Sequence, residues 1–238
     1  MTVEVRGWIV SARRIAVLTG AGMSAESGVP TFRDALTGLW AKFDPQQLAT
    51  EEAFRANPSM VWDWYAFRRG MIARVAPNDG HRALAEFEGR HPGRLTLVTQ
   101  NVDGLHQRAG SANVLALHGN ITGDKWLDPP KSCCDQAMPL PGSPPRCGRC
   151  GNMRRPDVVW FGEVLPMDAY ARAEEAARTC DVMLVVGTSG VVYPAAGLAR
   201  MAAGKVVIIN PEPSELDDAA DAVLRGTAAV LLPQLLED

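Results

Sequence analysis

The sequence lacks a long apolar run, an excess of positive charge and the features of a secretory signal. None of the apolar runs among its 238 residues reaches the length of a membrane-spanning helix, about 18 residues. The formal net charge is −3, which gives no electrostatic footprint for nucleic acid or an anionic membrane surface. Residues 1–6 have no basic start followed by an apolar segment. We therefore expect a cytoplasmic protein that binds neither membranes nor nucleic acid directly.

Histidine is also scarce, but the composition is otherwise that of a folded domain. The chain has 4 histidines, which leaves few candidates for a base that titrates near neutral pH. Its hydrophobic content of 47% and charged content of 21% are ordinary for a globular protein. A chain of this length can form one large domain, or a main domain with a smaller insert.

Short apolar runs rich in β-branched residues recur along the chain, with helix-like segments between them. They occupy residues 15–18, 95–99, 114–118, 182–186, 206–209 and 222–224. Continuous apolar strands that alternate with helices are typical of a parallel sheet covered on both faces. The sequence therefore predicts an α/β fold with a doubly wound, Rossmann-like parallel sheet.

Two stretches interrupt this alternation. Residues 36–78 have helical patterns and aromatic side chains but no clear strand, while residues 119–157 contain four of the five cysteines and many prolines. We interpret both stretches as insertions that together form a smaller domain. The larger domain would then comprise residues 1–35, 79–118 and 158–238, with a cleft between the two domains.

The first predicted strand runs into a glycine-rich segment, TGAGMSAESGVPTFRD, at residues 19–34. Gly20, Gly22 and the small Ala21 would let backbone amides approach an anion closely, and a helix expected near Ser24 would add its positive N-terminal end. The spacing differs from that of the common dinucleotide fingerprint. Taken alone, the segment could equally be an ordinary turn between a strand and a helix.

Polar groups follow the other predicted strands, and they favour the anion-binding interpretation. Ligands of open α/β sheets bind beyond the carboxyl ends of the strands. Amide, hydroxyl and carboxylate groups at this edge would serve as hydrogen-bond partners for two riboses and an adenine. The residues concerned are Gln100, Asn101, Asp103, Gly187, Thr188, Ser189, Asn210 and Glu212.

The motifs, taken in order, resemble those of the sirtuins, the NAD-dependent protein deacylases. They read GAGMSAESGVPTFRD, TQNVDGLHQRAG, LHGN, CGRC, VVWFGE, VVGTSGVVYPAAG and INPEP, and the resemblance covers almost the whole chain. It extends to the compact length of the bacterial members. The resemblance implies a reaction in which NAD and an acylated protein lysine give nicotinamide, O-acyl-ADP-ribose and free lysine.

The resemblance also implies roles for individual residues. His118 would be the catalytic base, while Asn101 and Asp103 would line the nicotinamide and ribose pocket. Phe32 would shield the reacting carbon, and Arg33 would lie on a loop that closes over NAD; taken singly, Phe32 could be a core aromatic and Asp103 a helix cap. The full set implied to bind the cofactor is Gly20, Ala21, Gly22, Ala25, Thr31, Phe32, Arg33, Gln100, Asn101, Asp103, Gly187, Thr188, Ser189, Asn210, Glu212 and Ala228.

Two further segments resemble those between which sirtuins bind a substrate peptide as an added strand. Recognition of this kind uses backbone hydrogen bonds, so the acylated protein would be read only weakly by its local sequence. Two ordinary strands would be the alternative interpretation. The positions implied to contact the substrate here are Val159, Phe161, Gly162 and Val192.

A predicted helix carries a further candidate pair. Asn57 can cap this helix, Pro58 suits its first turn and Gly70 can end it. Tyr65 and Arg68 are three residues apart and therefore share a face.

This Tyr-x-x-Arg pair resembles the one that marks desuccinylase-type sirtuins, in which both side chains contact the acyl carboxylate. It predicts a preference for succinyl or malonyl lysine, with acetyl lysine also accepted. The small Ala35 would leave room for the longer acyl chain. The alternative is an amphipathic helix on which Tyr65 is packed and Arg68 is solvated.

The cysteine cluster departs from the sirtuin pattern. Cys147 and Cys150 have the C-x-x-C spacing of a structural zinc site. The family usually has a second C-x-x-C after the catalytic histidine, but Trp126 and Pro129 stand in that region here. The adjacent pair Cys133 and Cys134 follows later, and both could bind one metal only if the chain makes a tight local turn. Either all four cysteines bind zinc, or three do so with another ligand, or zinc is lost; Cys180 would be a buried core residue.

Other functions are compatible with parts of this pattern. Mono-ADP-ribosyl transfer could use the same site, and a non-catalytic protein could sense NAD or acyl-lysine. His118, Asn101 and Asp103 argue against the sensor, because all three reactive positions are present. An ordinary NAD dehydrogenase is disfavoured by the spacing of the glycine-rich segment.

Overall fold

The structure, a computed structural model, describes residues 2–31, 44, 48–136 and 138–237. The chain divides into two compact units. Unit 1 consists of Met1–Arg33, Val75–His118 and Leu165–Asp238, and unit 2 consists of Asp34–Arg74 and Gly119–Val164. This division places residues 158–164 in unit 2 rather than with the larger unit.

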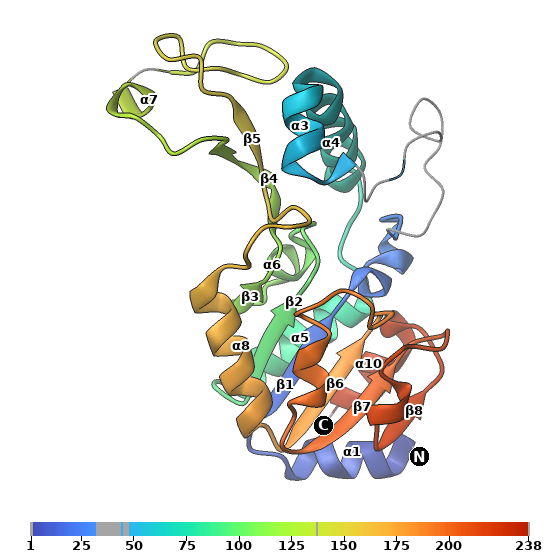
Figure 1. Cartoon of the computed structure of the whole chain (residues 1–238). Coiled ribbons are helices and arrows are strands. Elements are labelled where there is room, and N and C mark those ends of the chain that lie inside the picture. Colours follow the sequence, from blue (N-terminus) through green and yellow to red (C-terminus); the bar gives the residue numbers. More distant parts are fainter. Residues whose placement is uncertain (1, 32–43, 45–47, 137, 238) are drawn as a thin grey trace. The chain divides into compact units, whose positions relative to one another are not determined.

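Unit 1 is built on a six-stranded parallel sheet with the order β3-β2-β1-β6-β7-β8 (Figure 1). This order winds outward in both directions from the centre, so the winding reverses between β1 and β6, where such folds bind their ligands. The predicted doubly wound fold is confirmed. The strands are β1 (Ile15–Thr19), β2 (Leu95–Thr99), β3 (Val114–Ala116), β6 (Val182–Val186), β7 (Lys205–Ile209) and β8 (Ala222–Leu224).

Apolar side chains cover both faces of this sheet. Because side chains alternate along a strand, Val17 joins one core and the adjacent Leu18 joins the other. On the Val17 face the core includes residues of α1 (Thr2–Ser11), α5 (Asp79–Arg90) and α10 (Ala228–Leu236). On the Leu18 face it includes residues of α8 (Met167–Thr179) and α9 (Gly197–Arg200). No helix in the described part of the chain is long and apolar enough to cross a membrane.

The glycine-rich segment after β1 does not form the expected helix from Ser24. Instead it makes two short 3₁₀ turns, η1 (Ala21–Met23) and η2 (Ala25–Ser27), with Ser24 between them. Gly28, in the left-handed conformation with φ of 89°, ends the second turn. Two further short elements of unit 1 are α6 (Leu105–Ala109) and η4 (Asp217–Ala219).

The helical part of unit 2 follows the sequence prediction at its start but not at its end. The side chain of Asn57 accepts a hydrogen bond from the Met60 amide at 3.2 Å, and Pro58 occupies the first turn of α4 (Pro58–Ala73). The predicted end at Gly70 is wrong, because the helix continues for three residues and buries Ile72. Among the residues of this unit that the structure describes, the other helices are α3 (Glu51–Ala56) and α7 (Ser132–Gln136).

Unit 2 also contains an antiparallel pair of strands that the sequence does not reveal. Strand β4 (Gly119–Trp126) pairs with β5 (Arg154–Val158), with an irregular register between Asn120 and Asp124. Arg69 joins α4 to this pair, because its guanidinium donates to the Gly123 carbonyl at 3.0 Å and contacts the Asp124 carboxylate at 2.6 Å.

Candidate functional site

Two loops meet at the point where the winding of the sheet reverses. The Gly20 amide donates to the Val186 carbonyl at 2.9 Å, and the Gly22 amide donates to the Gly187 carbonyl at 2.8 Å. A Cβ atom at Gly20 would lie 2.8 Å from the Gly187 oxygen, and one at Gly22 would lie 2.8 Å from the Gly187 Cα. These glycines are therefore required for contact between the two loops. The two loops contain Gly20, Ala21, Gly22 and Gly187, which belong to the residues expected to bind the cofactor.

His118 lies two residues beyond β3, where its imidazole is held by one hydrogen bond. Its Nδ1 atom is 2.9 Å from the backbone carbonyl of Gln100. A carbonyl can only accept, so Nδ1 carries the hydrogen and Nε2 keeps its lone pair. Burial lowers the pKa of His118 below its ordinary value, against a smaller opposing effect of the Gln100 hydrogen bond. The imidazole can therefore accept a proton at Nε2 near neutral pH.

Asn101 and Asp103 are tied to the glycine-rich segment by Ser24. The side-chain amide of Asn101 donates to the Gly20 carbonyl at 2.9 Å and to the Ser24 hydroxyl at 3.2 Å. Ser24 in turn donates to the Asp103 carboxylate at 2.7 Å. The other carboxylate oxygen of Asp103 accepts from the Leu105 amide at 2.8 Å. This last bond goes to the first residue of α6, whose N-cap is Gly104 and has no side-chain cap hydrogen bond, so Asp103 does not take the alternative role of helix cap.

Ser24 was missed by sequence reasoning, as were two histidines behind it. The His81 Nδ1 atom accepts from the Asn78 amide at 3.3 Å, so in its neutral form Nε2 carries the hydrogen and donates to Ser24 at 3.4 Å. Burial lowers the pKa of His81 to about 4. The buried Ser24 hydroxyl thus receives two hydrogen bonds and gives one to Asp103. The available signal was Asn78 three residues before His81, the spacing of a capping box.

The second buried histidine, His106, belongs to a chain of hydroxyl groups at the ends of β1 and β2. Its Nε2 atom lies 3.0 Å from the Thr19 hydroxyl, which donates to the Thr99 hydroxyl at 2.8 Å. The Thr99 hydroxyl also accepts from the backbone amide of Asn101 at 3.0 Å. Burial lowers the pKa of His106 to about 3. Its ring centre is 4.8 Å from that of His81, so a charge on either ring would disfavour a charge on the other.

The residues expected on the adenosine side of the cofactor follow β6, β7 and β8. Gln100 donates to the Thr188 hydroxyl at 3.3 Å, which links the loops after β2 and β6. The side-chain amide of Asn210 donates to the Glu212 carbonyl at 2.7 Å, a hydrogen bond within the loop that follows β7. The Ala228 methyl is buried in the core, which leaves its backbone as the part that could contact a ligand.

The structure describes only part of the remainder of the expected cofactor loop. Ala25 is exposed and Thr31 is half-buried. Phe32, Arg33 and Ala35 lie outside the described residues.

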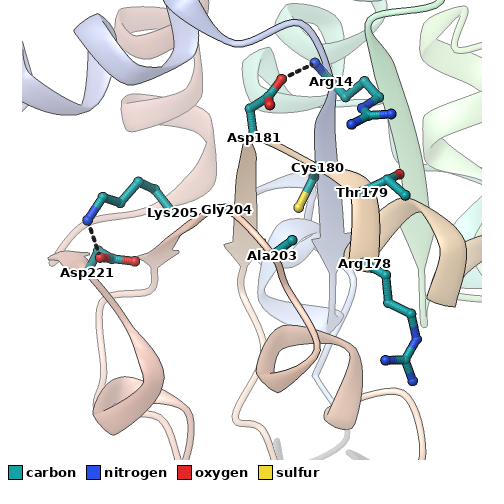
Figure 2. A pocket seen from close by; sticks show the side chains of 9 residues that line it. All are labelled: Arg14, Arg178, Thr179, Cys180, Asp181, Ala203, Gly204, Lys205 and Asp221. Atoms are coloured by element: carbon teal, nitrogen blue, oxygen red, sulfur yellow. Dashed lines mark hydrogen bonds and ion pairs between the residues drawn. The ribbon is translucent and has the colours of Figure 1, made fainter.

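A hollow of about 590 Å³ lies at the opposite edge of the sheet, beside the amino ends of β6 and β7 (Figure 2). Two acidic side chains there already have partners. Asp181 accepts from the Arg14 amide at 2.9 Å, and Asp221 pairs with Lys205 at 2.6 Å. The candidate residues that the structure describes do not line this hollow, so it is separate from the candidate site.

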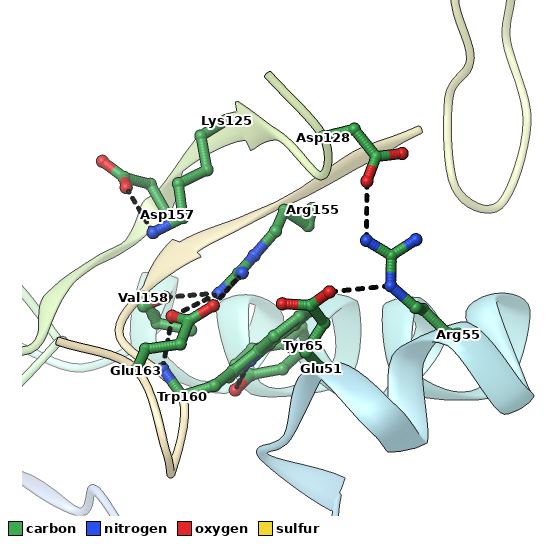
Figure 3. Close-up of polar contacts among 10 residues, drawn as sticks. All are labelled: Glu51, Arg55, Tyr65, Lys125, Asp128, Arg155, Asp157, Val158, Trp160 and Glu163. Atoms are coloured by element: carbon green, nitrogen blue, oxygen red, sulfur yellow. Dashed lines mark hydrogen bonds and ion pairs between the residues drawn. The ribbon is translucent and has the colours of Figure 1, made fainter. Parts of the chain in front are cut away.

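In unit 2, Tyr65 and Arg68 are neighbours on α4. The Tyr65 side chain is buried, and the Arg68 Cζ atom is 5.8 Å from the centre of its ring and 4.9 Å from that of Trp64. The Tyr65 hydroxyl accepts a hydrogen bond from the Trp160 indole at 2.9 Å (Figure 3). Burial raises the pKa of Tyr65, so the phenol keeps its proton at neutral pH.

The residues expected to contact the substrate peptide are divided between the units. Val159, Phe161 and Gly162 belong to unit 2, whereas Val192 belongs to unit 1. Phe161 is 45% exposed, so a large apolar side chain is presented on the surface of its unit. Its amide donates to the Ala49 carbonyl at 2.9 Å, so this hydrogen is already used within the unit.

The four clustered cysteines come together in unit 2. Their sulfur atoms all lie within 4.8 Å of one another. Cys133 and Cys134 occupy the short helix α7, and this helical turn allows two adjacent residues to face one centre. Backbone hydrogen bonds lower the pKa of Cys147 to about 6, while a hydrogen bond with Cys150 raises the pKa of Cys133 to about 12. Four thiolates could coexist only around a cation, and the cluster fits one tetrahedral zinc ion.

Cys180, the fifth cysteine, is buried in the core of unit 1, as predicted.

The sheet of unit 1 is Rossmann-like. At the carboxyl ends of its strands lie glycine-rich loops, an amide, a carboxylate and an imidazole. These features are typical of a nucleotide-binding α/β protein. The chain belongs to the Sir2 family, whose family model matches residues 20–194. The resemblance to the sirtuins is thereby confirmed.

Known relatives cover nearly the whole chain. It is 60% identical to an "NAD-dependent protein deacylase" of Ralstonia nicotianae, over 98% of this chain and 95% of the relative. A protein with the same description from Aquifex aeolicus is 49% identical, over 94% of each chain.

Solved structures agree with these relatives. A Sir2 homologue in complex with NAD is 42% identical, with a TM-score of 0.87 over 98% of this chain and 92% of that one. A complex of Sir2 with a p53 peptide and NAD⁺ is 30% identical, with a TM-score of 0.85 over 100% and 98% of the two chains.

Proposed function

We propose that this protein removes acyl groups from protein lysines in a reaction that consumes NAD. The products are nicotinamide, O-acyl-ADP-ribose and free lysine. The proposal is supported by membership of the Sir2 family and by relatives described as NAD-dependent protein deacylases. The observation that carries it is the imidazole of His118, whose Nε2 atom is left free to accept a proton by the bond from Nδ1 to Gln100.

His118 acts in this proposal as the general base that deprotonates a ribose hydroxyl. A general base is most effective when its pKa lies near the working pH, and burial keeps His118 neutral there. Asn101 and Asp103 position the nicotinamide and ribose. Ser24 supports this role, because its hydroxyl bonds to both side chains and so fixes their relative orientation.

The remaining cofactor residues follow from the same assignment. The segment Gly20–Gly22 lies against the pyrophosphate, and its two glycines contribute close approach only, because their amides already donate to Val186 and Gly187. Residues after β6, β7 and β8 hold the adenosine. Phe32 shields the reacting carbon and Arg33 closes over NAD. These two roles are carried over from the family motif alone.

The preferred acyl group in this proposal is acidic, either succinyl or malonyl, with acetyl also accepted. A carboxylate that leaves water needs charge-assisted hydrogen bonds to offset its lost hydration. Arg68 offers a planar donor for this purpose, and Tyr65 keeps its phenolic proton beside it. The acylated peptide binds by strand addition to the segments that contain Val159 and Val192.

A panel of acyl peptides incubated with NAD tests the function. Mass spectrometry should detect free lysine peptide together with O-acyl-ADP-ribose, and nicotinamide should be released only when an acylated peptide is present. Mono-ADP-ribosyl transfer would instead add ADP-ribose to protein without O-acyl product. A sensor would release no nicotinamide, and a dehydrogenase would generate NADH absorbance.

A further inference from the structure

The hydroxyl of Tyr65 is engaged on one side only. It accepts a hydrogen bond from the Trp160 Nε1 atom at 2.9 Å, and only 2% of the Tyr65 residue is exposed. Within the described residues, the phenolic hydrogen itself has no acceptor. Because the indole occupies a lone pair of the oxygen, this hydrogen is directed away from Trp160.

The Trp160 ring is itself held from two directions. The guanidinium carbon of Arg155 lies 3.3 Å from its centre, and the Phe54 ring lies 5.2 Å away at an angle of 39°. Both Trp160 and Arg155 are buried, with exposures of 2% and 3%. The indole therefore has little freedom to turn its N–H group away from Tyr65.

Residues that follow β5 hold the Arg155 guanidinium in place (Figure 3). It pairs through both terminal nitrogens with the Glu163 carboxylate, and it donates to the Val158 carbonyl at 2.8 Å. Glu163 also accepts from the Trp160 amide at 2.9 Å. Burial alone would raise the pKa of Glu163, but these hydrogen bonds outweigh it and the pKa is lowered, so the carboxylate stays charged.

We propose that Trp160, held by Arg155 and Glu163, is a positioning residue that aims the Tyr65 hydroxyl at the carboxylate of an acidic acyl group. This inference rests on the proposed function and adds to it the residues that set acyl specificity. A hydroxyl that accepts one hydrogen bond becomes a stronger donor in the next, because hydrogen bonds in a chain polarise one another. Tyr65 can then donate to the same carboxylate that Arg68 attracts.

The chemistry of Trp160 distinguishes this role from plain packing. A phenylalanine would supply an apolar ring for Phe54 and a face for the Arg155 guanidinium. Only the indole adds a donor, and that donor goes to Tyr65. The arrangement also joins the acyl reader on α4 to residues 159–163, the segment expected to bind the peptide backbone.

The experiment compares wild type, Trp160→Phe, Tyr65→Phe and the double variant on matched succinyl and acetyl peptides. Trp160→Phe keeps the ring and removes the N–H group. We expect the ratio of kcat/KM for the succinyl over the acetyl peptide to fall about five- to tenfold, mainly through the KM of the succinyl peptide, the size expected for one hydrogen bond. In the Tyr65→Phe background, the same change should leave the ratio unaltered, because the hydroxyl it aims is gone.

An equal loss on both peptides would overturn the inference, because Trp160 would then act through packing alone. An additional fall of the ratio in the double variant would also overturn it. If Trp160→Phe does not fold, Arg155→Lys keeps the positive charge but loses the planar stack, and the same selective fall is expected. The proposed function is judged separately by wild type, since failure to remove succinyl would overturn both proposals, whereas normal desuccinylation with an unaltered ratio in Trp160→Phe would overturn only this one.

Discussion

The two units of the molecule hold their candidate residues in different ways. In unit 1, the polar groups follow strands that are apolar on both faces, so a buried sheet sets their positions. Unit 2 adds polar contacts to a smaller set of buried apolar residues such as Phe54, Trp64 and Ile121. Arg69 joins α4 to β4, Arg155 joins β5 to Glu163, and four cysteines meet in one cluster.

This difference separates stability from specificity. Cofactor chemistry is assigned to the unit with the large apolar core, whose strand ends are hard to displace. Acyl recognition is assigned to the unit with charged and metal-binding contacts, in which removing one partner leaves another unsatisfied. Variants in unit 2 should therefore change which substrate is used, or whether the unit folds, more readily than they change the chemistry.

The largest effect is expected from the cysteine cluster. Cys147→Ser removes one ligand, and we expect zinc to fall from one ion per chain to almost none. Since binding to a structural zinc site contributes on the order of 10 kcal/mol to folding in small modules, unit 2 should unfold at a much lower temperature. Elemental analysis and a thermal melt measure the two effects.

The matched control for this change is Cys180→Ala, which alters a buried cysteine outside the cluster. It should keep its zinc while losing some stability through unit 1. A purified native protein without zinc would show that the four cysteines serve another purpose.

The next largest effect concerns the base in unit 1. His118→Tyr should lower turnover of every acyl peptide by about 10²- to 10⁴-fold, the usual contribution of a general base, while the fold survives. Nicotinamide release and peptide mass report the turnover, and circular dichroism reports the fold. His91→Tyr is the control, because its ring can keep the contact with Phe87 and it lies at the end of α5. Wild-type turnover in His118→Tyr would refute the assignment of the base.

A smaller and selective effect is expected from the acyl reader. Arg68→Met should lower succinyl-peptide kcat/KM by roughly two to three orders of magnitude, because a buried carboxylate would lose its charged partner. Acetyl-peptide turnover should stay within about tenfold of wild type, since a neutral acyl group does not need the guanidinium.

Arg69→Met provides the contrast for Arg68→Met. The Arg69 guanidinium is bonded to Gly123 and Asp124, so its removal should affect both peptides alike. The same equal loss in Arg68→Met would mean that Arg68 supports the fold instead of reading the acyl group.

The smallest effect per residue is expected from two buried histidines, His81 and His106, and should appear in the pH dependence of stability. His81 and His106 have pKa values of about 4 and about 3 in the folded protein, below their ordinary value of 6.5. Between pH 6.5 and 4 the unfolded chain therefore binds more protons, so the free energy of unfolding falls as the pH falls. We expect a loss on the order of 2 kcal/mol for each histidine by pH 4.5.

Urea unfolding at pH 7 and pH 4.5 measures this loss. His106→Gln removes one of the two titrating groups and should flatten the dependence, whatever its own cost in stability. An unchanged slope in that variant would show that carboxylates, and not the histidine pair, control acid sensitivity.

The strands of unit 1 could be predicted closely because most of their residues are apolar and buried. In β6, every side chain from Val182 to Val186 is buried, and a buried parallel strand has that pattern. The network around Ser24 could not be predicted in the same way. Its members come from separate loops and from the first turn of α5, and their contacts depend on how the chain folds back at the sheet edge.

Unit 2 was less predictable for physical reasons that particular residues show. Strand β5 reads RRPDV, which has no apolar alternation, and its buried Arg155 pairs with Glu163 and stacks on Trp160. Gly70 resembled a helix end, yet it is tolerated inside α4 while Ile72 anchors the last turn. The cysteine pair at Cys133 could be placed only once the helical turn was known.

The contact between Gly20, Gly22 and Gly187 limits how this protein can diverge. A side chain at any of the three positions would press on backbone atoms of the opposite loop, and no substitution elsewhere can shorten a backbone. We therefore expect that a substitution at any one of the three glycines separates the two loops. Under the proposed function, adaptation to a different nucleotide would come from the side chains around them, such as Thr188 and Asn210.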